Sequence, residues 1–273
     1  MFGKFYFTLM NLLNEKIVND FQLNGVCIIK NIINKHWLNI LAEGIEENFK
    51  KPSQYKCVYE KIQGNEIFYD DYCNWNRIKQ YKDFFFKSDI AIIASELMQS
   101  KEVNLFHEHV LIKEPGSKKK TPWHQDQSYY CVNGKDNCSL WIPLDPIAKT
   151  VCPEFIRGSH KWNNKYLPTK FFGESYKKKD DEFEKIPDIE NKRSNFDIVS
   201  WDMQPGDIIA FNFSTIHGAP GNLSINRRRA FSARFFGDDA TYIKRKGETS
   251  PPFPGLTLND GDKLNSNFFP KLL

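Results

Sequence analysis

The sequence predicts a mainly β fold, a sandwich of short strands with flanking N-terminal helices. From residue 103 onward, apolar and polar residues alternate in short stretches separated by proline, glycine and charged turns, which is typical of strands. Before residue 103, apolar residues recur at helical spacing. A length of 273 residues with 40% hydrophobic content fits one domain with a sizeable core.

The N-terminal part is expected to be a helical flank with short strands, spanning about residues 1–102. Its predicted elements are helices over 14–23, 34–49 and 75–98, and a strand over 26–30. The chain enters that strand through Asn24-Gly25, a dipeptide suited to a turn. The β core then covers about 103–240, and 241–273 form a C-terminal extension. No linker indicates a second domain.

Two segments leave alternatives open. The polar stretch 163–200 contains Lys177-Lys178-Lys179 followed by Asp180-Asp181-Glu182, and it fits either a mobile lid over the site mouth or a disordered surface loop. The apolar residues 1–9 lack the core length and the cleavage site of a signal peptide. They are either part of the native protein or an extension upstream of a start at Met10.

Composition narrows the compartment and the partners. A net charge of +4 is too modest to indicate nucleic-acid binding, and no apolar run approaches the length that spans a membrane. The six cysteines are scattered without metal or disulfide spacing, which fits a reducing compartment. We therefore expect a cytoplasmic protein that binds a small molecule, with no nucleic-acid or membrane partner. The sequence does not indicate its oligomeric state.

The most informative motif is His124-Gln125-Asp126. Residues i and i+2 of a strand share a face, so His124 and Asp126 can present an imidazole and a carboxylate side by side. These are two of the three ligands of the facial triad that holds non-haem Fe(II). His217, far downstream, is the predicted third ligand, a separation that suits a β-sandwich.

An arginine cluster follows His217. A guanidinium presents a rigid fork of donors that matches a carboxylate. Arg228, on the strand predicted after His217, is the expected partner for a cosubstrate carboxylate, with Arg229 as the alternative if the register slips. A dicarboxylate such as 2-oxoglutarate would use this contact at its distal end.

Several blocks of the sequence resemble the phytanoyl-CoA dioxygenase family, in that family's order. The blocks are Phe106–Gly116, Thr121–Asp126, Leu140–Asp145, Gly158-Ser159-His160, Gln204–Asp207 and His217–Ala230. The resemblance implies a double-stranded β-helix (jelly-roll) core and an Fe(II)- and 2-oxoglutarate-dependent dioxygenase that uses O2 and releases succinate and CO2. It also implies that Asp126 favours hydroxylation over halogenation, since halogenating relatives lack this carboxylate.

The resemblance also assigns residues. It places His124, Asp126 and His217 as iron ligands, Arg228 on the 2-oxoglutarate carboxylate, and Lys113 and Trp141 along the cosubstrate pocket. Ala219 departs from the family, many members of which carry a hydroxyl residue there. Four further residues are expected to line the substrate site: His107, Trp123, Gln127 and Arg157.

The remaining histidines are read as structural. His36 precedes Trp37 in a helical stretch, and His160 lies in a loop. His109 is a weaker pocket candidate than His107, and Glu108 between them points to the other face.

The exposed cations Lys118, Lys119, Lys120 and Arg157 slightly favour an anionic or zwitterionic substrate. Three hypotheses remain. They are a hydroxylase of a small metabolite, a non-redox jelly-roll metalloenzyme, and a binding protein with a vestigial metal site.

Overall fold

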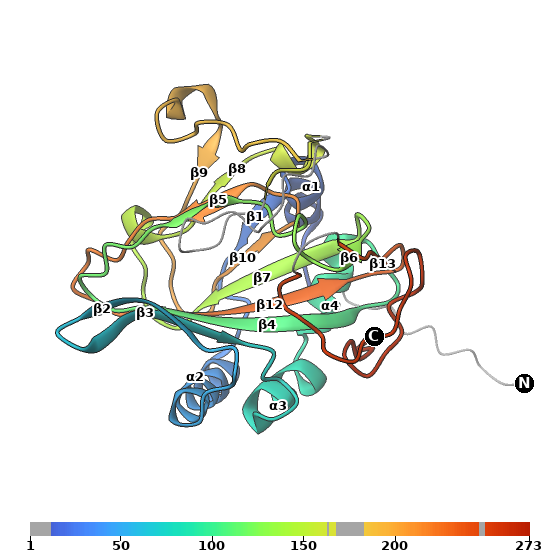
Figure 1. Ribbon diagram of the computed structural model, residues 1–273, viewed down its shortest axis with the longest axis horizontal. Coiled ribbons are helices and arrows are strands. Elements are labelled where there is room, and N and C mark those ends of the chain that lie inside the picture. Colours follow the sequence, from blue (N-terminus) through green and yellow to red (C-terminus); the bar gives the residue numbers. More distant parts are fainter. Residues whose placement is uncertain (1–11, 163, 168–182, 246–248) are drawn as a thin grey trace, which may run out of the picture.

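The computed structural model describes residues 12–162, 164–167, 183–245 and 249–273 (Figure 1). The segment 168–182, which carries most of the predicted lid, and residues 1–11 lie outside the described residues. Two antiparallel sheets face each other, and helices cover the outer face of the larger sheet (Figure 1). This arrangement confirms the predicted mainly β, jelly-roll architecture.

The larger sheet has seven strands, in the order β1 (Val26–Ile29), β10 (Ile208–Phe211), β7 (Asn137–Pro143), β12 (Arg228–Phe236), β4 (Asn104–Lys113), β3 (Asn65–Tyr72) and β2 (Cys57–Ile62). The smaller sheet has four, in the order β5 (Thr121–His124), β11 (His217–Ala219), β8 (Glu154–Ile156) and β9 (Ile198–Val199). A separate pair joins β13 (Thr241–Tyr242) to β6 (Val132–Asn133).

The helices are α1 (Glu15–Asn24), α2 (Lys35–Lys50), α3 (Lys79–Lys87) and α4 (Ile90–Met98), with short 3-10 turns at Lys149–Val151, Ser159–Lys161 and Arg193–Asn195. The first two match the predicted ranges to within one residue. Asn14 and Asn34 cap them, because each side chain accepts the backbone N–H three residues on, at 3.0 and 3.1 Å.

The single helix predicted over 75–98 is wrong, because the chain breaks at Ser88. The Ser88 hydroxyl donates to the Phe84 carbonyl at 2.6 Å and accepts the N–H of Ile90 at 3.3 Å. It thus ends α3 and starts α4. The hairpin of β2 and β3 was not predicted as such, and β1, β2 and β3 all join the larger sheet, so the flank and the core share one sheet.

The two faces of β12 have different surroundings. Phe231 and Phe235 pack against Phe85 of α3, with ring centroids 5.8 and 6.0 Å apart. Each buried phenylalanine of this kind contributes about 1.5–3 kcal/mol to the stability of the fold. Strand alternation turns Arg228 and Arg234 the other way, toward the smaller sheet. The face of the larger sheet that the helices cover therefore packs through apolar side chains, and the opposite face carries buried polar side chains.

All six cysteines are free thiols. No helix in the described ranges combines the length and the apolar character that crossing a bilayer requires.

Candidate metal centre

Strand pairing in the smaller sheet brings two histidines together. His217 of β11 lies directly opposite His124 of β5 in the antiparallel register, and their ring centroids are 4.2 Å apart. Two residues that are 93 positions apart in the chain are therefore neighbours, because the backbone hydrogen bonds of β5 and β11 pair their strands. Asp126 follows the end of β5 by two residues and completes the group.

A backbone carbonyl oxygen fixes the orientation of each imidazole. His124 Nδ1 lies 2.8 Å from the Pro122 carbonyl oxygen, and His217 Nδ1 lies 2.9 Å from that of Thr215. A carbonyl oxygen only accepts, so each Nδ1 donates, and in the neutral ring Nε2 is then the unprotonated nitrogen. Metal-binding histidines are held in this way, with the second nitrogen donating to a carbonyl.

The unprotonated nitrogens face one carboxylate oxygen. His124 Nε2 and His217 Nε2 lie 3.5 and 3.9 Å from Asp126 Oδ1. The three potential ligand atoms lie within 4.8 Å of one another, and all three residues are buried. In the described part of the chain, this is the one group of three such residues that could hold a metal ion.

The electrostatics favour the ligand form of Asp126 and of His217. Burial raises the pKa of Asp126, but the Arg234 guanidinium and the two histidines outweigh it, leaving that pKa well below its usual range. Burial, assisted by His124, lowers the pKa of His217 to about 3. A neutral imidazole and an ionised carboxylate are the forms that bind a metal. The donor set of two nitrogens and one oxygen suits Fe(II).

The turn between α1 and β1 supports the loop that carries His217. The Thr215 hydroxyl donates to the Gly25 carbonyl at 2.7 Å, and the Thr215 carbonyl holds His217. Gly25 has φ +70°, and a Cβ there would lie 2.2 Å from His160 Nδ1 and 2.7 Å from Thr215 Oγ1. Only glycine fits this close approach. His160 therefore packs on the turn, in agreement with its structural interpretation.

Arg228 is buried on the inner face of β12 without an acidic partner. One of its terminal nitrogens donates to the Val151 carbonyl, and within the described ranges no carboxylate pairs with it. Burial lowers its pKa to about 10. Arg229 lies on the other face, where its guanidinium binds both oxygens of Asp145 at 2.8 and 3.1 Å. The register thus leaves Arg228, not the alternative Arg229, available to an incoming carboxylate.

Lys113 lies directly across from Arg228 in the β4–β12 register. Its amino group lies 2.9 Å from the Lys119 and Pro220 carbonyl oxygens and 3.4 Å from Thr121 Oγ1. Burial, together with the Arg228 charge, lowers its pKa to about 6. Lys113 thus fastens two loops beside Arg228, and these contacts occupy its nitrogen.

An apolar wall borders the histidines. Trp141 belongs to the same buried cluster as Phe155 and Phe211, between the two sheets. The rings of Phe155 and Phe211 lie 5.6 and 4.6 Å from that of His217. This wall keeps water from one side of the site.

The structure places two of the predicted substrate residues away from the metal group. Trp123 alternates with His124 on β5, so it lies on the opposite face, where its indole N–H contacts Glu190 Oε1 at 3.3 Å. Arg157 is at the surface, where its guanidinium lies 3.7 Å from Asp197. Neither side chain joins the metal group.

The other two predicted substrate residues are turned inward. His107 is buried on the inner face of β4, opposite Arg234. Gln127 uses its side-chain amide on the Val132 carbonyl at 2.6 Å, which ties the turn after Asp126 to β6.

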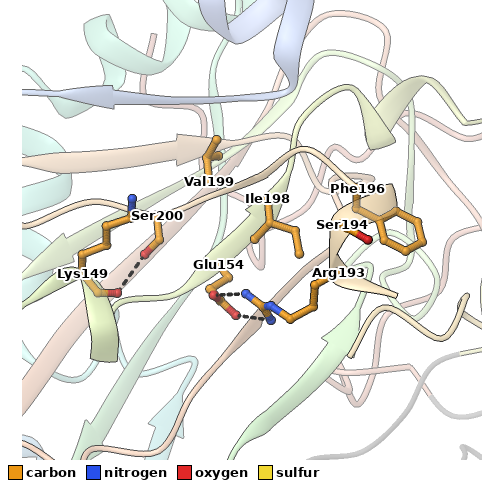
Figure 2. Close-up of a pocket in the computed structure, with 8 residues that line it drawn as sticks. All are labelled: Lys149, Glu154, Arg193, Ser194, Phe196, Ile198, Val199 and Ser200. Carbon is orange, nitrogen blue, oxygen red and sulfur yellow. Dashed lines mark hydrogen bonds and ion pairs between the residues drawn. The ribbon is translucent and has the colours of Figure 1, made fainter. Parts of the chain in front are cut away.

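A hollow of about 390 Å³ lies beside β8 and β9, away from these residues (Figure 2). Arg193 spans it and donates to both oxygens of Glu154 at 2.5 and 3.2 Å (Figure 2). Ser200 donates to the Lys149 carbonyl at 3.2 Å. None of the predicted site residues lines this hollow, and its charged pair is already satisfied.

Sequence reasoning missed two neighbours of Asp126. The Tyr129 hydroxyl donates to Asp126 Oδ1, and Arg234 Nε lies 3.5 Å from Asp126 Oδ2. Arg234 could have been found, because it lies six residues after Arg228 on an alternating strand and so shares its inner face.

Comparison with known proteins places this geometry in a family. A family model described as phytanoyl-CoA dioxygenase (PhyH) matches residues 21–230. A phytanoyl-CoA dioxygenase of Arabidopsis thaliana is 31% identical over 153 residues, which cover 56% of this chain and 50% of that protein. A probable phytanoyl-CoA dioxygenase of Caenorhabditis elegans is 23% identical over 248 residues, 84% of this chain and 77% of the relative. The chain thus spans only half the length of the Arabidopsis relative.

Solved structures share the fold. The non-haem α-ketoglutarate-dependent carbocyclase SnoK from nogalamycin biosynthesis superimposes with a TM-score of 0.73 and 19% identity, over 96% of this chain and 97% of SnoK. The epimerase SnoN, in complex with Fe3+, α-ketoglutarate and nogalamycin RO, gives a TM-score of 0.71 and 18% identity, over 95% of this chain and 98% of SnoN.

Proposed function

Since the chain belongs to the phytanoyl-CoA dioxygenase family, we propose that it is an Fe(II)- and 2-oxoglutarate-dependent dioxygenase that hydroxylates a small molecule. The observation that carries the proposal is the buried group His124, Asp126 and His217, with both histidines held by Nδ1 so that Nε2 faces the carboxylate.

The residues fit the proposed cofactors. His124, Asp126 and His217 would hold Fe(II), because two imidazole nitrogens and one carboxylate form the donor set of non-haem iron oxygenases. Arg228 would bind the distal carboxylate of 2-oxoglutarate, since it is a buried cation whose charge no carboxylate among the described residues balances. When bound, Fe(II) with 2-oxoglutarate and O2 supplies the oxidising chemistry, releasing succinate and CO2.

The protein itself orients the metal ligands and excludes water from one side of the site. The carbonyl oxygens of Pro122 and Thr215 hold both imidazoles by Nδ1, which orients Nε2 of each ring toward the position of the metal. The aromatic rings of Phe155 and Phe211 exclude water beside His217. The carboxylate of Asp126 supports hydroxylation over halogenation, as the family resemblance implies.

The substrate is proposed only as a small molecule. The anionic or zwitterionic substrate inferred from sequence rested on surface cations. Two of these have partners at the surface, Lys120 with Glu190 at 3.8 Å and Arg157 with Asp197 at 3.7 Å. They therefore give no support to a particular substrate charge.

Anaerobic titration tests the cofactor set. Fe(II) and 2-oxoglutarate added without oxygen should give a visible metal-to-ligand charge-transfer band in the wild-type protein. His217→Ala should abolish the band, and Arg228→Met should shift its 2-oxoglutarate dependence to higher concentration. Arg229→Met is the matched control, since Arg229 binds Asp145 on the other face. Absence of a band in the wild type would overturn the proposal.

Succinate release distinguishes the remaining functions. Release triggered by one compound from a metabolite panel would identify the substrate. A non-redox metalloenzyme would bind the metal without any requirement for Arg228, and a vestigial site would bind neither metal nor 2-oxoglutarate.

A further inference from the structure

We propose that Arg234 is a positioning residue of the metal centre, which holds one oxygen of Asp126 and leaves the other as a single-oxygen ligand. The inference rests on the proposed function only in that the His124–Asp126–His217 group binds a metal. It assigns a role to a buried guanidinium that the ligand set does not include.

The two oxygens of Asp126 face different groups. Oδ1 faces His124 Nε2 and His217 Nε2 at 3.5 and 3.9 Å, and it accepts the Tyr129 hydroxyl. Oδ2 faces Arg234 Nε at 3.5 Å. Both atoms are inaccessible to solvent, and the Tyr130 hydroxyl is a further neighbour of the two side chains. The carboxylate is thus divided between a metal-facing oxygen and a guanidinium-facing oxygen.

Arg234 is held where it is by its neighbours on the larger sheet. It lies opposite His107 of β4 and Ser139 of β7 in the strand register. Its guanidinium lies 5.9 Å from the centre of the Tyr130 ring, and one terminal nitrogen donates to the Ser232 carbonyl at 3.3 Å. These contacts leave the side chain little freedom to turn away from Asp126.

Charge makes the pairing necessary. Arg234 is only 6% exposed and Asp126 only 1%, so each would be an uncompensated buried charge without the other. Within the described ranges, Asp126 is the carboxylate that pairs with Arg234. Because Asp126 and Arg234 already balance each other's charge, a bound dication would keep most of its positive charge for further anionic ligands. Because Arg234 holds Oδ2, Asp126 would give the metal only one oxygen.

Co(II) binding to the full chain tests the role without requiring catalysis. Arg234→Gln should weaken Co(II) affinity by about 10–100-fold, the usual effect of losing a partner of a metal ligand. It should also change the Co(II) visible absorption, because Asp126 becomes able to turn both oxygens to the metal. Arg234→Lys keeps a cation beside Asp126 and should lose less Co(II) affinity than Arg234→Gln.

The matched control is Arg245→Met. Arg245 is a half-buried arginine, and among the described residues it donates to the carbonyls of Tyr130 and Gln127, at 2.9 and 2.6 Å. Loss of a half-buried arginine alone should leave Co(II) affinity and absorption close to wild type. An equal loss in both variants would mean that Arg234 has only a structural role.

A second measurement leaves Arg234 unchanged and replaces Asp126 instead. In Asp126→Ala, added formate should occupy the position beside the guanidinium and raise Co(II) affinity by about tenfold, and Asp126→Ala combined with Arg234→Gln should lose this rescue. Formate rescue in both variants, or in neither, would overturn the proposal. Wild-type protein that binds no Co(II) would overturn the metal centre itself, whereas unchanged binding by Arg234→Gln would overturn only the role of Arg234.

Discussion

Replacing Arg228 by methionine should stabilise the metal-free protein while weakening its binding of 2-oxoglutarate. Arg228 is buried, and its guanidinium donates to one backbone carbonyl, that of Val151. Methionine keeps much of the side-chain length and removes the charge. Fold and function therefore make opposite demands on this residue.

The pKa gives the size of the effect. Burial lowers the pKa of Arg228 from 12.5 to about 10. A shift of this size corresponds to about 3 kcal/mol of destabilisation of the charged form. Loss of the hydrogen bond to Val151 offsets about 1.5 kcal/mol. The net gain for Arg228→Met is therefore roughly 1–2 kcal/mol in the free energy of unfolding.

The pH dependence of this stability difference follows from the same pKa shift. The folded-state pKa lies below the unfolded one, so the penalty is fully present below pH 10 and declines as pH rises from there toward 12.5. The difference between Arg228→Met and wild type should thus stay constant from about pH 6 to 9. Urea unfolding with EDTA at two pH values in this range measures it.

Cosubstrate binding provides the second half of the test. Loss of the guanidinium should weaken 2-oxoglutarate binding by about tenfold or more, measured by titration of the Fe(II) charge-transfer band. Arg229→Met removes a partly exposed arginine that binds Asp145. It should cost about 0–1 kcal/mol and leave the titration unchanged. A variant at Arg228 that is less stable than wild type, or that binds 2-oxoglutarate equally well, would refute the reasoning.

Three further predictions follow from the site's surroundings. Lys113 has a folded-state pKa of about 6 against 10.5 in water, so between these pH values the unfolded chain binds one more proton and stability rises with pH. In urea unfolding, the free energy of unfolding of the wild type should therefore increase relative to that of Lys113→Met from pH 6.5 to 8.5. An equal change in both proteins would contradict this prediction. Gly25→Ala should lower stability by about 2 kcal/mol or more and weaken Co(II) binding, seen by thermal melting and titration, because the new Cβ meets His160 and Thr215; an unchanged melting temperature would exclude the close approach. EDTA should leave far-UV circular dichroism unchanged, because β5 and β11 pair through backbone bonds; unfolding on metal removal would show that the strands need the ion.

Sequence reasoning reached the parts of the fold that local rules determine. Apolar spacing located α1 and α2, and alternation predicted the strands after residue 103. The break at Ser88 was missed, because a serine hydroxyl that competes for a helical carbonyl gives no signal in apolar periodicity.

The candidate site divides in the same way. The proximity of His124 and His217 was inferred from a motif, but their direct pairing depends on the register of β5 and β11. Trp123 lies on the face opposite His124, as the alternation that joins His124 to Asp126 already implies. Strand alternation puts Arg234 on the same face as Arg228 and could have located it, but its pairing with Asp126 depends on how the two sheets pack.

The turn at Gly25 also matters for where this protein can be shortened. The family match begins at residue 21, inside α1, so a fragment that starts there and runs to residue 273 would lose the Asn14 cap and most of the helix. All three ligands and Arg228 would remain in such a fragment. Gly25 donates its N–H to the Phe21 carbonyl at 2.8 Å, and in this fragment the helix that holds that carbonyl would be reduced to about one turn, so the Gly25 carbonyl that accepts from Thr215 would be held less firmly. We expect such a fragment to bind Co(II) more weakly than the full chain, so the functional unit begins before the first residue that family likeness detects.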